Sequence, residues 1–212
     1  MATATEILTL TQWFSPAYPV GAFAYSHGLE WAVESDQVTD AASCKAWVTD
    51  VLRDGAARND VILMAEAYRA DNPQAVDAIV RALASSKERL METRLQGEAF
   101  CAATSAIWAR DLSGLTYPVA MGHAARLENL SLELTAQMYL QAFMSNLIAA
   151  AMRLVPLGQT EGQQVIRDLT PLCAEIASKA IGQRLDDLGS AAFLADIAAM
   201  KHETQYSRIF RT

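Results

Sequence analysis

The spacing of apolar residues is the sequence feature that most restricts the possible folds of this chain, because every regular stretch of it has the period of a helix. Between residues 85 and 110 an apolar side chain recurs at every fourth position: Met91, Leu95, Ala99, Ala103 and Ile107. Arg89, Glu92 and Gln96 lie off this row. The segment is therefore predicted to be one long amphipathic helix whose apolar row packs against another helix. No stretch alternates apolar and polar residues as a half-buried strand does, so hardly any β-structure is expected.

Other segments show the same helical period. Residues 131–154 are apolar except for a thin polar stripe, which predicts a central buried helix. Alanine occurs 39 times, whereas glycine and proline, which break helices, occur only 10 and 6 times. The predicted fold class is all-α, a single domain of roughly ten helices packed around a central apolar helix. Shorter helices are predicted over residues 39–55, 59–70, 73–84, 118–130, 162–180 and 190–200, and the pairs Asn72-Pro73 and Thr170-Pro171 are typical of helix starts.

Composition excludes several classes of protein. Apolar residues make up 52% of the 212 residues and charged residues 19%, which predicts a soluble globular chain rather than a disordered or fibrous one. The net charge of −7 has the wrong sign for a nucleic-acid partner. The most apolar run, residues 147–152, is far shorter than the roughly 20 residues that cross a bilayer, and no secretory signal is visible, so no membrane partner is expected. A cytoplasmic location is expected from three widely spaced cysteines: Cys44, Cys101 and Cys173.

The chain carries no recognisable catalytic or cofactor motif. It lacks both the GxxxxGK[ST] phosphate loop and the GxGxxG dinucleotide pattern. His202-Glu203 begins like a zinc-protease helix, but Tyr206 stands where that motif needs its second histidine. The other two histidines, His27 and His123, lie in distant parts of the chain. We therefore predict no catalytic residue, no metal site and no cofactor, and we expect the chain not to be an enzyme.

Residues 15–30 form the first segment whose composition is unusual. Pro16 and Pro19 fix φ and remove backbone donors, so residues 15–20 are predicted to form a stiff extended loop. Gly21 then permits the turn into a following helix. Four large aromatic side chains crowd this loop, and they either fill a core or present an interface: Tyr18, Phe23, Tyr25 and Trp31.

The C-terminal segment, residues 200–212, is the second segment with an unusual composition. Residues 200–212 carry three basic side chains and one acidic one, whereas the rest of the chain carries fourteen basic and 23 acidic side chains. The segment also interleaves Tyr206, Ile209 and Phe210 with Arg208 and Arg211, residue types that are enriched at binding hot spots. Docking on the chain's own domain and recognition of a partner both explain this pattern, and the residues alone leave the two open.

Besides these two segments, short motifs with a recognisable spacing occur along essentially the whole chain. They are Ser15-Pro16, Pro19-Val20-Gly21, Phe23, Tyr25-Ser26, Gly28-Leu29-Glu30, Glu92-Thr93-Arg94, Tyr117-Pro118-Val119 with Gly122, residues 153–159 with Gly162-Gln163, His202-Glu203, Tyr206-Ser207-Arg208 and Phe210-Arg211. Together they resemble the urease accessory protein F (UreF) family, whose members are nickel-urease maturation factors. Ala22 and His27 depart from that pattern, which most often has glycine and glutamine there. His27 is therefore given no metal role.

The resemblance implies an all-α, dimerising scaffold that is not a catalyst. Such a protein binds the accessory protein UreD, called UreH in some systems, and recruits the GTPase UreG. The complex then acts as a chaperone that delivers nickel to apo-urease on GTP hydrolysis. The nucleotide chemistry would belong to UreG, which would explain the missing phosphate loop.

The resemblance also implies roles for individual residues. Residues 1–200 would form the helical domain and residues 201–212 a partner-binding tail that is disordered alone and becomes ordered against UreD. The contact with UreD or UreH would involve Tyr206, Ser207, Arg208, Phe210 and Arg211. The residues that would shape a partner-facing loop and the helix after it are Pro16, Pro19, Gly21, Tyr25, Gly28 and Glu30.

Two rival interpretations stay open. In the first, the chain is a GTPase-activating regulator that inserts an arginine beside the phosphates held by UreG, with Arg94, Arg184 and Arg208 as candidates. In the second, it is a nickel-binding helical protein that uses its three histidines. The second interpretation lacks the carboxylate–histidine spacing that helical metal sites show.

Overall fold

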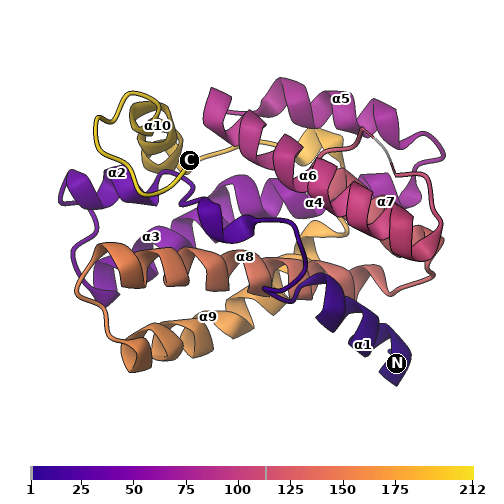
Figure 1. Ribbon diagram of the computed structural model, residues 1–212, viewed down its shortest axis with the longest axis horizontal. Helices are drawn as coiled ribbons and strands as arrows, with labels where there is room; N and C mark the ends of the chain where they lie inside the picture. The colour runs from indigo at the N-terminus through magenta and orange to yellow at the C-terminus, as the bar shows by residue number, and fades with distance from the viewer. Residues whose placement is uncertain (1, 113) are drawn as a thin grey trace.

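A computed structural model of the chain describes residues 2–112 and 114–212 (Figure 1). In these two ranges it contains ten α-helices, two short 3-10 turns and no strand, which confirms the predicted all-α class. The elements in chain order are α1 (Ala4–Trp13), η1 (Ala22–Ala24), α2 (Leu29–Glu34), α3 (Ala41–Asp54), α4 (Ala56–Arg69), α5 (Pro73–Leu83), α6 (Lys87–Trp108), α7 (Tyr117–Leu127), α8 (Leu132–Leu154), α9 (Gln159–Ala180), η2 (Leu185–Asp187) and α10 (Phe193–His202).

The central helix is α8, as its apolar sequence predicts. It crosses the middle of the molecule in Figure 1 and packs against α2, α3, α4, α7 and α9. Leu140, Met144 and Ile148 on α8 are completely buried. The helix begins where the Ser131 hydroxyl accepts a hydrogen bond from the backbone N–H of Leu134, a standard N-cap.

Helices α4 and α7 make the most extensive helix–helix contact of the fold. Gly122 of α7 lies directly on the backbone of α4: a Cβ placed on it would stand 2.2 Å from the carbonyl oxygen of Met64. Gly97 of α6 is equally close to the segment before α7, where a Cβ would lie 2.3 Å from the Leu115 carbonyl oxygen. Small residues at these two points allow α4, α6 and α7 to form one tightly packed layer.

The structure corrects the predicted buried face of α6. Ile107, the last member of the apolar row, is 57% exposed, whereas Glu92 and Gln96, which lie off that row, are buried. Glu88 is buried on the same side of the helix. The prediction was wrong because the buried side of α6 combines Phe100, which packs against Tyr117 of α7, with charged residues that are buried through ion pairs such as that of Glu92 with Arg89.

Two local predictions also need correction, and one helix was not predicted. Residues 15–20 are not extended but form successive turns. The first turn is closed by a hydrogen bond from the Tyr18 N–H to the Ser15 carbonyl, and Pro16 is its second residue, a position that proline favours. Pro171 does not start a helix but lies inside α9, on an exposed side where water can bond the freed carbonyl. Helix α1 was not predicted, because its Thr- and Ala-rich sequence carries little periodicity.

Within the described residues, no helix combines the length and the apolar character that crossing a membrane requires.

Candidate functional site

The N-terminal signature loop, residues 15–28, leads from α1 to α2. Pro16, Pro19 and Phe23 lie on its surface, whereas Tyr25 is buried. Gly21 begins η1 with a φ of 70°, a left-handed conformation that favours glycine. Phe23, which follows in η1, is 71% exposed. The loop therefore presents an aromatic side chain and two prolines on the outside while it anchors itself inside through Tyr25.

Gly28 joins this loop to the C-terminal part of the chain. Its φ is 78°, and a Cβ on it would lie 2.7 Å from the backbone nitrogen of Ala199 in α10. Both the left-handed backbone and the close approach of α10 require glycine here. The signature glycine is thus explained by packing inside the chain.

Residues 203–212, here called the tail, fold back over α2 and the signature loop (Figure 1). The Arg211 N–H donates to the carbonyl of Ala24, and the N–H and hydroxyl of Ser26 both donate to the carbonyl of Thr212. Burial raises the pKa of the Tyr25 hydroxyl, which the hydrogen bond with the Arg211 side chain partly offsets. The tail and the signature loop are therefore one continuous unit.

Glu30 of α2 holds the tail backbone. Its two carboxylate oxygens accept the N–H groups of Ile209 and Phe210 at 2.7 and 2.9 Å. Phe210 is 5% exposed and lies under the guanidinium of Arg153 from α8, 4.5 Å from the ring centroid. Arg208 donates to Glu88 of α6 at 2.7 Å. Backbone hydrogen bonds, one buried ring and one ion pair thus fix the tail to three different helices.

His202, the last residue of α10, lies at the centre of this arrangement. Its side chain is 0% exposed. The Nδ1 atom is 2.7 Å from Glu88 and the Nε2 atom is 3.1 Å from Glu30. One imidazole therefore connects the two carboxylates that hold the tail.

A second buried network continues from this point into the core. Asp60 of α4 accepts hydrogen bonds from Arg89 at 2.6 Å and from the Tyr139 hydroxyl at 2.7 Å. Glu92 lies 3.3 Å from Nδ1 of His27 and 3.5 Å from Arg89. Burial raises the pKa of the Glu92 carboxyl, but the charge of Arg89 and the hydrogen bond with His27 outweigh burial and lower it overall. The network therefore keeps Glu92 ionised inside the fold.

The outer face of α10 is apolar and open. Phe193, Leu194, Ile197 and Met200 are between 49% and 67% exposed, and their spacing places them along one side of the helix. The opposite side of α10 is buried against α2 through small residues such as Ala198. In the tail, Ile209 is 63% exposed and Tyr206 is fully exposed, so the apolar surface continues beyond the helix.

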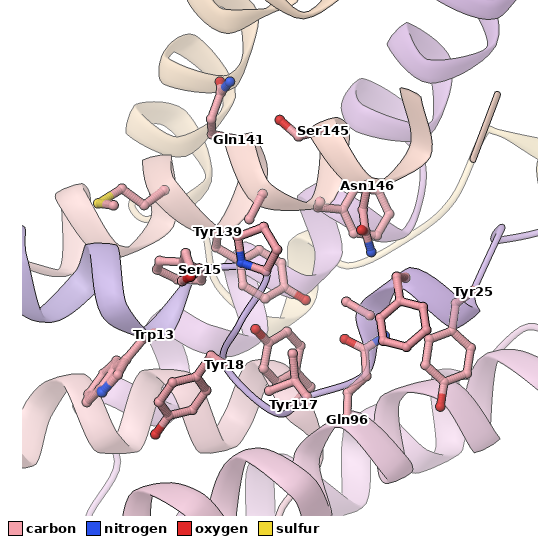
Figure 2. Close-up of a pocket in the computed structure, with 18 of the residues that line it drawn as sticks. Trp13, Ser15, Tyr18, Tyr25, Gln96, Tyr117, Tyr139, Gln141, Ser145 and Asn146 are labelled. Atoms are coloured by element: carbon pink, nitrogen blue, oxygen red, sulfur yellow. The ribbon is translucent and has the colours of Figure 1, made fainter. Parts of the chain in front are cut away.

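A cleft of about 1130 Å³ lies behind the signature loop, between α1, α6, α7 and α8. Figure 2 shows the aromatic rings of Trp13, Tyr18 and Tyr117 around the loop, with Gln141 and Ser145 on α8 pointing away from them. Leu8 of α1, which is 69% exposed, also lines the cleft. An apolar opening of this size is suited to protein contact or a ligand.

The structure brings the two predicted groups of site residues together at one end of the molecule. Of the tail residues, Tyr206, Ser207, Arg208 and Arg211 reach the surface, while Phe210 is buried on the chain's own domain. Lys201 and His202, predicted to start the tail, belong to α10. The sequence reasoning missed Glu88, Asp60 and Arg89 because charged residues on a helix are ordinarily solvated. No local pattern marked them, since Arg89 lies off the apolar row of α6 and Asp60 belongs to α4.

The arginine candidates of the first rival interpretation have partners in the chain's own fold. Arg94 lies 3.4 Å from Glu98 on the surface of α6, and Arg184 lies 3.3 Å from Glu66. Burial lowers the pKa of His123, whose Nδ1 has no hydrogen-bond partner in the structure. In residues 2–112 and 114–212, no three His, Cys, Asp or Glu side chains are grouped as a metal ion would need.

Comparison with known proteins gives consistent matches. The sequence pattern of the UreF family matches residues 38–170. The chain is 63% identical over 217 residues to the urease accessory protein UreF of Ruegeria pomeroyi, with all of both chains covered. It is 52% identical over 207 residues to that of Roseobacter denitrificans, covering 97% of this chain and 93% of the relative. It is 47% identical over 220 residues to that of a Methylobacterium species, covering 97% and 88%.

Proposed function

The chain belongs to the UreF family of urease accessory proteins, and from this premise we propose that it is a non-catalytic scaffold for nickel insertion. Its place is in urease maturation. In the proposed complex it binds UreD or UreH, recruits the GTPase UreG, and so acts as part of a chaperone that loads apo-urease with nickel when GTP is hydrolysed. A cytoplasmic location goes with this proposal and stays a prediction.

The exposed apolar face of α10 is the observation that carries the proposal. Four large apolar side chains in a row on one amphipathic helix are a docking surface rather than a core, because nothing in the described part of the chain covers them. Tyr206 and Arg208 extend this face with residue types that anchor protein interfaces. We assign this surface, the α10–tail face, to UreD or UreH.

The signature loop provides a second surface beside the first. Backbone hydrogen bonds at Ala24 and Ser26 tie the loop directly to the tail. A partner bound to the α10–tail face therefore also contacts, or positions, the element that carries exposed Phe23 and Pro19. Recruitment of a second partner such as UreG after the first is consistent with this continuity.

The test is binding of the full chain to UreD from the same organism, measured by chromatography with light scattering. Ile197→Asp places a charge in the centre of the α10 face and is expected to weaken the complex by at least about tenfold, as loss of an interface anchor does. Ile107→Asp, the same change at an exposed position in the last turn of α6, is the matched control and should bind normally. Equal binding by both variants would overturn the assignment of the α10–tail face.

A homodimer is the second part of the proposal. Leu8 is an exposed large side chain at the cleft, and burying it against a second copy would remove apolar surface from water. Leu8→Asp is expected to convert a dimer into a monomer in light scattering while circular dichroism keeps its helical signal. A wild-type chain that is monomeric at roughly 50 micromolar would contradict the homodimer and leave the rest of the proposal standing.

A further inference from the structure

Helix α1 is the α-helix of this fold that its own chain supports least. Among the described residues it is the only α-helix without an extensive contact with another helix. It buries two side chains, Leu10 and Trp13, both in its second half, while its first half runs away from the body of the molecule (Figure 1). A helix of 10 residues is shorter than the roughly 12–15 residues that an isolated helix needs in water. The first half of α1 therefore requires a further contact.

The exposed side of α1 lies at the cleft between α1, α6, α7 and α8. Leu8 is 69% exposed, and Thr11 and Gln12, one turn further along the same side, are also exposed. All three line the cleft. Glu6, the charged side chain of α1, is used within the chain, where it accepts the N–H of Ser131 at the start of α8. The side of α1 at the rim of the cleft is therefore uncharged and partly apolar.

The opposite wall of the cleft is a stripe of α8 that suits a second helix. Met138, Ala142, Ser145 and Ala149 line the cleft at the spacing of one helix face, and all four are at least partly exposed. Three of them are small, and small side chains at a contact let two helix axes come close. The wall can therefore receive a helix lengthwise.

The size and the charge of the cleft favour a protein segment, and in particular an uncharged one. Its volume of about 1130 Å³ exceeds the roughly 300–1,000 Å³ of small-molecule pockets. The charged residues that line it in the described part of the chain are Arg89 and Glu92, which are buried and paired with each other at 3.5 Å. An uncharged rim can meet an identical rim although each chain carries a net charge of −7, because no like charges are brought into contact there.

An exposed ridge and a hollow on the same face make this face self-complementary. The ridge is the side of α1 that carries Leu8, and the hollow lies between α1 and the stripe of α8. In a pair of copies related by a two-fold axis, the ridge of each copy meets the hollow of the other, so one arrangement satisfies both. The described residues that line the cleft all precede residue 150, so this arrangement involves neither α10 nor the tail.

We propose that the cleft is filled by helix α1 of a second copy of this chain, in a reciprocal exchange about a two-fold axis. Each α1 then lies between α1 and α8 of the other copy, with Leu8 buried against the stripe that contains Ala142. This inference rests on the homodimer of the proposed function and names the element that fills its interface. The exchange gives the first half of α1 the contact that its own chain does not supply, and it leaves the α10–tail face free for a different partner.

Photo-crosslinking in the full chain identifies the occupant of the cleft. Leu8 is replaced by the photoreactive amino acid benzoylphenylalanine, and this variant is mixed with isotope-labelled wild type and allowed to exchange chains. Crosslinks from position 8 are expected to reach labelled peptides of α8 that contain residues 138–149. The same replacement at Gln12 gives a second reporter on the same side of α1. Leu83, which is 53% exposed on α5 and does not line the cleft, is the matched control and should give no crosslink to α8.

Ala142→Asp tests the opposite wall. It places a charge in the uncharged stripe and is expected to weaken the dimer by at least about tenfold, measured by light scattering over a dilution series. Ala174→Asp, the same change at an exposed position of α9, is the control and should dimerise as the wild type does. Circular dichroism checks that both variants keep the helical content of the wild type. A folded Ala142→Asp variant that dimerises as strongly as the wild type would overturn the proposed exchange.

The crosslinking results separate this inference from the homodimer itself. A dimeric chain whose crosslinks from positions 8 and 12 reach only other surfaces would overturn the exchange of α1 and leave the homodimer standing. A chain that is monomeric at roughly 50 micromolar would overturn both. Crosslinks that form only after UreD is added, and only to UreD, would also overturn the exchange, and would assign the cleft to that partner.

Discussion

Gly122→Ala tests the close crossing of α4 and α7 on which the fold depends. Elsewhere in a helix this change stabilises, because alanine has a helix propensity about 1 kcal/mol better than glycine. Here the added Cβ would lie 2.2 Å from the carbonyl oxygen of Met64 and about 3 Å from two further backbone atoms of Met64. Backbone atoms in a packed helix cannot rotate away as a side-chain end can.

The geometry sets the magnitude. An ordinary contact of a Cβ begins near 3.4 Å, so the two helices must separate by more than 1 Å at this point. Separation of close-packed helices loses dispersion contacts along the whole interface, and overpacking a core costs about 1–3 kcal/mol or more. Because the clash is with backbone atoms, we take the upper end of that range, about 3 kcal/mol; with the gain in propensity of about 1 kcal/mol subtracted, the expected net loss is about 2 kcal/mol.

Urea unfolding followed by circular dichroism measures this loss as a lower midpoint at an unchanged slope. Gly189→Ala is the matched control, because no atom lies within 4 Å of a Cβ at that position. Its free energy of unfolding should stay within about 0.5 kcal/mol of that of the wild type. A Gly122→Ala variant as stable as the wild type would show that α4 and α7 are not in backbone contact.

Three further predictions concern single buried contacts. Phe210→Ala should increase cleavage of the tail by trypsin, because it removes the ring under Arg153, whereas Tyr206→Ala, at a fully exposed position, should not; equal cleavage would contradict the docked tail. Asp77→Ala should lower the free energy of unfolding by about 1–3 kcal/mol, because it leaves the buried Thr116 N–H, which this carboxylate accepts at 2.6 Å before α7, without its acceptor; an unchanged urea midpoint would refute that role. The pKa of Glu92 in the folded chain lies below its ordinary value of 4.5, so its contribution to stability is present above that pH and is lost as the pH falls below it. Glu92→Gln should therefore be less stable at neutral pH, and its stability should depend less steeply on pH in acid. An acid unfolding profile identical to that of the wild type would contradict this prediction.

The fold could be predicted from local pattern far better than the site could. The apolar stretch of α8 and the Asn72-Pro73 start of α5 were visible in the sequence because helix formation and capping depend on near neighbours. The buried side of α6 could not be seen. Hydropathy places Glu92 in water, and its burial depends on His27, which reaches it from the signature loop 65 positions away, as well as on Arg89 one turn earlier on α6.

The same holds for the candidate site: local motifs could be recognised, but roles that depend on distant contacts could not. Both signature segments were recognisable, but the reasons for Gly28 and Glu30 were not. Gly28 is needed because α10 passes over it, and Glu30 because the tail backbone ends on it, contacts that join residues some 170 to 180 positions apart. The residues alone left open whether the tail rests on the chain's own domain, and the structure buries Phe210 of this chain there.

By itself, the sequence determined the helical class, the order of most helices, the acidic charge and the two segments that mark the UreF family. These follow from residues that act over one or two helical turns, or from motifs whose spacing is preserved along the chain. Only the tertiary structure decided which helix faces are buried, that His202 lies between Glu30 and Glu88, and that α10 leaves an apolar face open. The physical reason is that buried charge and exposed apolar surface are properties of distant neighbours, which no local pattern records.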